Sequence, residues 1–223
     1  DLEGRPTSKI NHLDLTVLTL TYDANGRVAS RWTPARGTTY FSYDAVGNLT
    51  FINYPISPDV SFSYDNLNRL TGMSDATGST GFSYTTSGQL ASEDGPWPSD
   101  TVTYSYDMNR WRSTMNASQP SGTTWNQTYS YDNRGRLLEL VTPVGTFNYH
   151  YWSSAVSDRV ASVTLPGVGW INYSYDGRGL LSWTEFRQAP NTVISRLDYT
   201  YNEGGQRIRE TRPNNYVDFT YDN

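Results

Sequence analysis

The sequence predicts an all-β fold of tandem antiparallel β-hairpins. Three observations support this prediction: a Tyr-Asp pair recurs at intervals of 20 to 26 residues when its variants are included, apolar and polar residues alternate before each pair, and turn-forming residues follow it. Repeats of this length are typical of arrays in which each unit packs on its neighbours. We therefore expect residues 1–223 to form a single array of about ten hairpins, an excerpt of a larger repeat protein.

The Tyr-Asp pair marks the same point in every repeat. Two residues before the Tyr stands an aromatic residue in nine of ten repeats, and the residue between them is polar in all ten. A period of two with many aromatic residues is typical of a half-buried strand. Each Tyr should therefore end the first strand of a hairpin, and the Tyr rings should stack on one another and be well buried. The pairs are Tyr22-Asp23, Tyr43-Asp44, Tyr64-Asp65, Tyr106-Asp107, Tyr131-Asp132, Tyr175-Asp176 and Tyr221-Asp222, with variants at Tyr84-Thr85, Tyr151-Trp152 and Tyr201-Asn202.

The residues after each Tyr have the chemistry of a tight turn. An Asp at the first turn position accepts hydrogen bonds from the backbone N–H groups that follow it. Three residues later, a Gly suits the left-handed conformation that closes a type I turn with a bulge. Glycine stands there at Gly4, Gly26, Gly47, Gly88, Gly135, Gly179 and Gly205, and Asn68 replaces it once.

Two repeats depart from this turn pattern, and we expect their turns to be irregular. The repeat of Tyr106 is interpreted as lacking one turn residue. The repeat of Tyr151 has additional residues between Trp152 and Asp158.

The composition argues against several kinds of partner. The net charge is −5 and Lys9 is the only lysine, so nucleic acid is not an expected partner, because phosphate binding requires clustered Lys and Arg. The chain has no Cys, which excludes a disulfide framework and a thiolate metal site. No apolar run approaches the ~20 residues of a membrane helix, so no membrane span is expected.

The repeated Asp residues are the first candidates for chemistry, as acid–base pairs or as calcium ligands. A turn-capping role is favoured, because the Asp recurs at seven of the ten turns, whereas a catalytic pair needs only two, and Thr85, Trp152 and Asn202 replace it in the other three. The only histidines, His12 and His150, do not form a zinc motif. The sequence therefore predicts no catalytic residue, no cofactor and no metal, and hence no enzyme. The arginines that follow the turns are expected to pair with turn carboxylates or Tyr rings rather than to clamp an anion: Arg27, Arg69, Arg136 and Arg207.

The tryptophans outside the Tyr-Asp row leave two interpretations open. Exposed aromatic rings can stack on sugars or anchor a partner. The favoured interpretation is that they cover connections and sheet edges. They are Trp32, Trp97, Trp125, Trp152, Trp170 and Trp183.

These repeats resemble the YD repeat of the Rhs family. The segments 41–50 (FSYDAVGNLT) and 129–138 (YSYDNRGRLL) are similar to its consensus, and 201–208 (YNEGGQRI) is similar to its longer turn. The resemblance implies a long sheet of YD hairpins that spirals into a hollow shell, as in Rhs toxins, the C components of insecticidal toxin complexes and teneurins. In bacterial members the shell encloses a toxic C-terminal domain released at paired Asp-Pro motifs, whereas teneurins act in cell adhesion. This chain has no Asp-Pro dipeptide, so the processing site is not expected within it.

The expected function is that of a non-catalytic structural segment of a large secreted or surface YD-repeat protein. The segment would form part of a β-shell wall that encloses a toxin or effector domain. The alternative is a repeat unit of an extracellular fibre, or a cell-surface adhesion or carbohydrate-binding module. Expected partners are further YD repeats of the same chain or another copy, an enclosed toxin domain, or a glycan. The expected location is extracellular or at the cell surface, in a bacterium.

Overall fold

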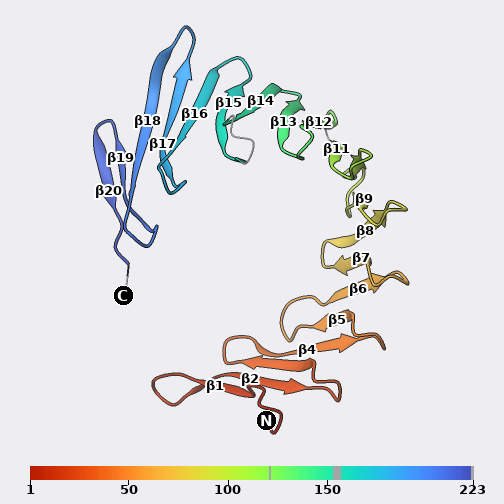
Figure 1. The fold of residues 1–223 in the computed structure, drawn as a ribbon. Helices are drawn as coiled ribbons and strands as arrows, with labels where there is room; N and C mark the ends of the chain where they lie inside the picture. Colours follow the sequence, from red (N-terminus) through yellow and green to blue (C-terminus); the bar gives the residue numbers. More distant parts are fainter. Residues whose placement is uncertain (121, 153–156, 222–223) are drawn as a thin grey trace. The chain divides into compact units, whose positions relative to one another are not determined.

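The computed structural model describes residues 1–120, 122–152 and 157–221. Over these residues the chain forms twenty β-strands and no helix (Figure 1). The all-β prediction is thereby confirmed. In the same residues there is no helix long and apolar enough to cross a membrane. The chain divides into two compact units, residues 1–103 with 117–123 and residues 104–116 with 124–223.

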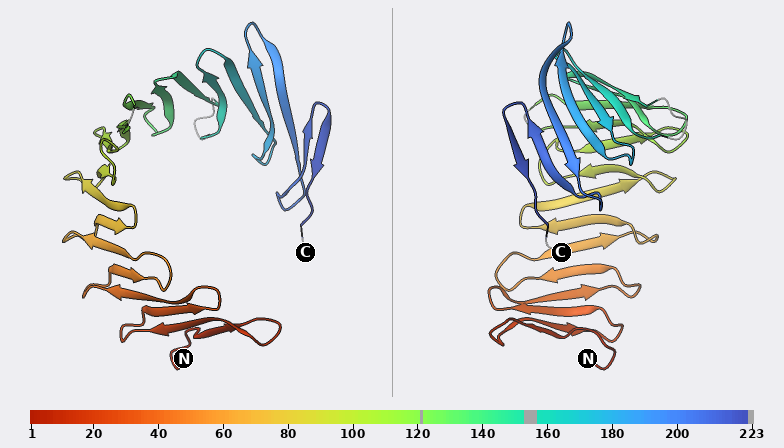
Figure 2. Two further views of the ribbon diagram at one scale, coloured as in Figure 1. Left: turned by 180° about the vertical axis from the view of Figure 1, so that it is seen from behind. Right: turned by 60° about the vertical axis from the view of Figure 1, so that its left-hand side comes forward.

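The first unit is a meander of antiparallel strands. Consecutive strands from β1 to β10 pair antiparallel, and they lie side by side in sequence order (Figure 2). The strands are β1 (Ser8–Ile10), β2 (Thr16–Tyr22), β3 (Val28–Thr33), β4 (Gly37–Tyr43), β5 (Leu49–Asn53), β6 (Val60–Tyr64), β7 (Leu70–Asp75), β8 (Gly78–Tyr84), β9 (Leu90–Asp94) and the start of β10 (Val102–Tyr106).

The second unit repeats the same arrangement. From β12 to β20, each strand again pairs antiparallel with its successor. The strands are most of β11 (Arg112–Ala117), then β12 (Trp125–Tyr131), β13 (Leu137–Thr142), β14 (Gly145–Tyr151), β15 (Val160–Leu165), β16 (Gly169–Tyr175), β17 (Leu181–Gln188), β18 (Thr192–Tyr201), β19 (Arg207–Arg212) and β20 (Asn215–Asp218).

The Tyr of a repeat ends the first strand of its hairpin, as the alternation predicts. Nine strands end at such a Tyr; the exception is Tyr221, which lies beyond the end of β20 at Asp218. In eight hairpins the pairing register shifts between the polar residue and the Tyr, as between Thr21 and Tyr22. A register shift beside a tight turn is a β-bulge, which matches the turn that the glycines predict.

The turn after Tyr106 is regular, contrary to the sequence-based expectation. Arg110 donates its N–H to the Asp107 carbonyl at 3.0 Å, and Asp107 donates its own to the Trp111 carbonyl at 2.9 Å. Arg110 has a φ of 66°, in the left-handed region that Gly occupies elsewhere. This repeat therefore lacks the Gly and not a turn residue.

The other turn expected to be irregular, between Trp152 and Asp158, includes residues 153–156, which lie outside the described residues. At its ends, Trp152 donates its N–H to the carbonyl of Arg159 at 3.1 Å.

Side-chain packing is thin because each unit consists of one sheet. In the part of the chain that the structure describes, strands contact only their neighbours in sequence, and Val163 is the only buried hydrophobic residue, 8% exposed. The prediction that the Tyr rings are well buried is wrong. The repeat tyrosines are half-buried, and Tyr221 is 47% exposed. No second layer covers the rings within a unit, so only neighbouring strands and long side chains can shield them.

Candidate functional site

The Asp side chain of each repeat binds the backbone of its own turn. Asp23 Oδ1 accepts hydrogen bonds from the N–H groups of Asn25 and Arg27, both at 2.9 Å. The same two bonds, to the second and fourth residues after the Asp, occur at Asp44, Asp65, Asp107, Asp132 and Asp176. Asp222 lies outside the described residues.

Two of the variant repeats keep part of this capping geometry. Thr85 Oγ1 accepts the N–H of Gln89 at 3.1 Å, and Asn202 Oδ1 accepts that of Gln206 at 2.9 Å. A hydroxyl or an amide oxygen is thus sufficient for the bond to the fourth residue. This equivalence is expected of a structural cap, since Asn, Thr and Asp all hydrogen-bond to nearby backbone.

The second carboxylate oxygen pairs with an arginine four residues on. Arg27 Nε donates to Asp23 Oδ2 at 2.7 Å, and Arg69 and Arg136 do the same to Asp65 and Asp132. The N–H of Arg27 is the main cause that lowers the pKa of Asp23, followed by the Arg27 side chain. The pKa of Asp65 is lowered in the same way by Arg69. These carboxylates are therefore held ionised.

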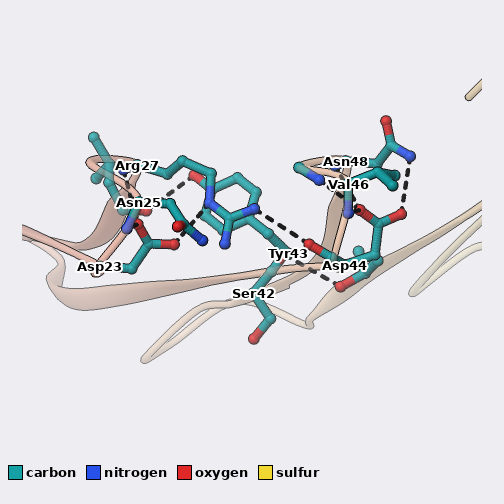
Figure 3. Close-up of polar contacts among 11 residues, drawn as sticks. Asp23, Asn25, Arg27, Ser42, Tyr43, Asp44, Val46 and Asn48 are labelled. Carbon is teal, nitrogen blue, oxygen red and sulfur yellow. Dashed lines mark hydrogen bonds and ion pairs between the residues drawn. The ribbon is translucent and has the colours of Figure 1, made fainter.

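The same arginines reach across to the next hairpin. The guanidinium of Arg27 lies over the ring of Tyr43, 4.5 Å from its centre, and its Nη1 donates to the Asp44 carbonyl at 3.2 Å (Figure 3). A cation over an aromatic face is attracted by the ring's quadrupole. Equivalent stacking joins Arg5 to Tyr22, Arg69 to Tyr84, Arg136 to Tyr151 and Arg159 to Tyr175.

The Tyr hydroxyl makes the third contact of the repeat. Tyr43 donates to the carbonyl of Val28, the first residue of the second strand in the preceding hairpin, at 2.9 Å. The corresponding bond, 2.6 to 3.1 Å long, is made by Tyr22, Tyr64, Tyr84, Tyr151, Tyr175, Tyr201 and Tyr221. Five tyrosines therefore contact the previous hairpin through both its Arg and its backbone: Tyr22, Tyr43, Tyr84, Tyr151 and Tyr175. Among the described residues, none of these five rings stacks on an equivalent Tyr.

This three-part contact was not predicted from the sequence, although its signal is present. The arginines after the turns were expected to pair with turn carboxylates or with Tyr rings, and Arg27, Arg69 and Arg136 each do both. Arg207 differs, because it stacks on Tyr199 of its own hairpin at 4.2 Å and lies 3.7 Å from Glu210.

Substitutions at the fourth position show how the contact adapts. Trp111 takes the Arg position, and its ring lies 5.5 Å from the ring of Tyr131. Asn48 takes it in the repeat of Asp44, where its Nδ2 donates to Asp44 Oδ2 and to Asn68 Oδ1, both at 2.9 Å.

The left-handed residue of the following turn lies against the side chain at this fourth position. A Cβ on Gly26 would lie 2.8 Å from Arg5 Nη1, and one on Gly47 would lie 3.7 Å from Arg27 Nη1. The guanidinium therefore rests against the bare glycine of the next turn. Where that residue is Asn68, the shorter Asn48 stands in place of the arginine. In this pair the larger left-handed residue faces a shorter side chain, whereas Trp111 and Leu180 replace the Arg beside Gly135 and Gly205.

The tryptophans divide between exposed and partly covered positions. Trp97 is 59% and Trp152 is 49% exposed, whereas the guanidinium of Arg196 lies 4.6 Å from the centre of the Trp183 ring. Within residues 1–120, 122–152 and 157–221, no group of three or more His, Cys, Asp or Glu is arranged to hold a metal ion.

An antiparallel sheet of Tyr-Asp hairpins, joined by Tyr and Arg contacts between neighbours, is the architecture of a YD-repeat array. In agreement, residues 1–96 match the family described as teneurin YD-shell. Among curated proteins, none matches the sequence.

Solved structures with the same fold come from toxin complexes. A crystal structure of TcdB2-TccC3 is 14% identical, with a TM-score of 0.60, and the match covers 91% of this chain and 13% of that one. The Photorhabdus luminescens Tc holotoxin pore with a TccC3 mutation is 17% identical (TM-score 0.56, 91% and 13% covered), and TcdB2-TccC3-Cdc42 is 16% identical (TM-score 0.54, 94% and 14% covered). The chain thus spans about a seventh of the chains that it matches. At these identities the likeness shows the fold, and with the family match it confirms the resemblance to YD-repeat proteins.

Proposed function

We propose that this chain is a non-catalytic structural segment of a larger YD-repeat protein, part of a β-shell wall. The observation that carries the proposal is the contact between consecutive hairpins, in which a Tyr hydroxyl binds the backbone of the preceding hairpin and an Arg covers its ring. Units that contact only their neighbours build extended surfaces whose stability is a sum over repeats. The matches to the teneurin YD-shell family and to the TcdB2-TccC3 fold support a wall rather than a globular domain.

The state of the Asp residues supports a structural role for the repeat motif. A general acid needs a raised pKa, and a carboxylate pair in a glycosidase has one such group. Backbone N–H bonds are instead the first cause that lowers the pKa of Asp23, Asp65 and Asp176. We therefore assign the Tyr, Asp and Gly of each repeat to the fold and not to catalysis.

Three solved structures that share the fold bear on what the wall encloses. Two of them are described as TcdB2-TccC3, and a third as a Tc holotoxin pore. By analogy, we propose that the wall encloses a toxin or effector domain, that its immediate partners are further YD repeats, and that the protein is secreted or displayed on the surface of a bacterium.

Electron microscopy of the purified longer protein that contains these residues tests the proposal. Closed, hollow particles in negative stain are expected. Filaments would indicate a fibre, and small compact particles without an interior would indicate an adhesion or binding module; either outcome contradicts the wall. As a second arm, limited proteolysis should spare an enclosed domain in the intact particle and cleave it after mild denaturation.

A further inference from the structure

A small cavity in the first unit has no role in the contact between Tyr-Asp repeats. Its volume is about 210 Å³, and it is lined by Arg31, Arg36, Thr39, Tyr54 and residues 55–57. These residues come from β3, the β3–β4 turn, β4 and the connection between β5 and β6.

The sheet register brings the lining residues together. Arg31 on β3 pairs directly with Thr39 on β4, so both side chains lie on the same face. Arg36 precedes Gly37, which has a φ of 75°. A Cβ on Gly37 would lie 3.4 Å from Pro55 Cγ, so the turn packs closely against the connection and closes one side of the cavity.

The polar side chains of the cavity have no hydrogen-bond or ion-pair partners among the described residues. Arg5, Arg27 and Arg69 of the same unit all form ion pairs with carboxylates. Arg31 and Arg36 form none, and their side chains make no hydrogen bond to any residue that the structure describes. Two free guanidinium groups at one cavity attract an anion, in a protein whose net charge is −5.

Thr39 and Tyr54 add hydroxyl groups to the lining of the cavity. Thr39 is only 3% exposed, and its side chain makes no hydrogen bond within the described part of the chain. The Tyr54 hydroxyl also makes none there. A hydroxyl that lines a cavity and lacks a protein partner is available to a molecule bound there.

We propose that this cavity binds an acidic sugar residue, through a carboxylate held by Arg31 and Arg36. Guanidinium groups match the planar carboxylate, while the Thr39 and Tyr54 hydroxyls suit ligand hydroxyls. The Tyr54 ring and Ile56, 78% exposed, offer apolar surface to a sugar ring. The volume is below the range of about 300–1,000 Å³ that encloses drug-sized ligands, which limits the bound portion to roughly one ring. This site goes beyond the wall function and does not depend on it.

Calorimetric titration of the protein with glucuronic acid tests the proposal, with glucose and acetate as probes that lack the carboxylate or the ring. Glucuronic acid should bind, glucose should not bind detectably, and acetate should bind at least tenfold more weakly. Arg31→Gln and Arg36→Gln should each weaken glucuronic acid binding at least tenfold, and Thr39→Val should weaken it several-fold. Raising the salt concentration should weaken binding as well, because exposed charges are screened.

Lys9→Gln is the matched control, because Lys9 is an exposed cation of the same unit outside the cavity and without a partner among the described residues. It should leave binding unchanged. Equal binding of glucose, equal binding of acetate, or an equal loss in Lys9→Gln would each overturn the proposal. Unfolding midpoints of the two surface Arg variants, expected to be unchanged, show that any loss of binding is not a loss of fold.

Discussion

The hydroxyl of Tyr64 donates a hydrogen bond of 2.9 Å to the carbonyl oxygen of Leu49. Leu49 begins β5 and Tyr64 ends β6, and the backbone pairing between these strands is limited to Phe51–Ser61 and Ile52–Val60. The Tyr side chain therefore extends the junction between two hairpins towards the turns, where the ladder has ended. Tyr64, whose position is set by the turn that follows it, thus binds the backbone of the preceding hairpin.

Asp65→Asn should destabilise the protein more than Asp44→Asn. Asp65 Oδ2 accepts from the Arg69 side chain, whereas Asp44 Oδ2 accepts only from the neutral Asn48 amide, which can turn its oxygen towards a new amide. Both substitutions keep an oxygen for the turn N–H groups. Urea unfolding of the two variants measures the difference. Equal losses of stability would show that the ion pair with Arg69 contributes nothing.

Acidification should remove the contribution of the turn carboxylates to the free energy of unfolding. The pKa values of Asp23, Asp65, Asp132 and Asp176 are lowered by folding, so their stabilisation is complete above the unfolded value of 3.8 and is lost as the pH falls through the folded values. Asp65→Asn removes one such group, so the free energy of unfolding of this variant should fall less than that of the parent protein between pH 7 and about pH 2. Unfolding curves of the two proteins at several pH values should converge at the acid end. Parallel curves would contradict the assignment.

Raising the pH should remove the stabilisation that the neutral repeat tyrosines contribute. Burial is the first cause that raises the pKa values of Tyr64, Tyr151 and Tyr175 above 10.0. A raised pKa means that the stabilisation is complete below the unfolded value and is lost as the pH rises through the folded value. Spectrophotometric titration should therefore show a group of tyrosines that ionise only above the ordinary range, in step with unfolding. Ionisation of all tyrosines near pH 10 in the folded protein would be inconsistent with the structure.

Exchanging the Asn48–Asn68 pair for the Arg–Gly pair of other repeats should be favourable only in combination. Asn48→Arg alone would place a guanidinium against the Asn68 side chain, and Asn68→Gly alone would remove the 2.9 Å bond between the two amides. Together they should recreate the stacking of Arg27 on Tyr43, now on Tyr64. Such a contact contributes about 0.5–1 kcal/mol at exposed sites.

A double-mutant cycle measures this coupling. The double variant should be more stable than the sum of the single changes predicts, by about that amount. The same exchange made as Asn48→Ala with Asn68→Gly is the control, because it restores no guanidinium. Strict additivity of Asn48→Arg and Asn68→Gly would show that the two side chains are not coupled.

The strands and most turns were predictable because they follow from local chemistry. Alternation fixes which residues of β4 or β16 face each way, and a Gly such as Gly26, at φ 79°, specifies its turn within four residues. The prediction for the turn at Asp107 was wrong because Arg110, with a φ of 66°, adopts a conformation that is usual only for Gly or Asn.

The contacts between repeats were not predictable from periodicity alone. Alternation indicates that the tyrosines share a face, but not whether their rings meet each other or an intervening side chain. Val28 and Tyr43, which are 15 residues apart in the sequence, meet only because of the register between β3 and β4 and the bulge at Tyr43. Likewise, the cavity at Arg31 and Thr39 depends on the pairing of two strands and on a connection that no sequence pattern identifies.

Tyr64→Phe tests whether the Tyr hydroxyl joins consecutive hairpins. The substitution keeps the ring and removes only the donor to Leu49, so unfolding in urea should show a loss of roughly 0.5–1.5 kcal/mol, the usual net contribution of a hydrogen bond. Tyr64→Ala should cost more, but less than the about 3–5 kcal/mol of a fully buried aromatic residue, because the ring is half-buried. Tyr40→Phe is the matched control, since Tyr40 is 57% exposed and its hydroxyl has no partner among the described residues. Stability should fall in Tyr64→Phe and stay unchanged in Tyr40→Phe; equal stability of Tyr64→Phe and the parent protein would show that the hydroxyl does not join the hairpins.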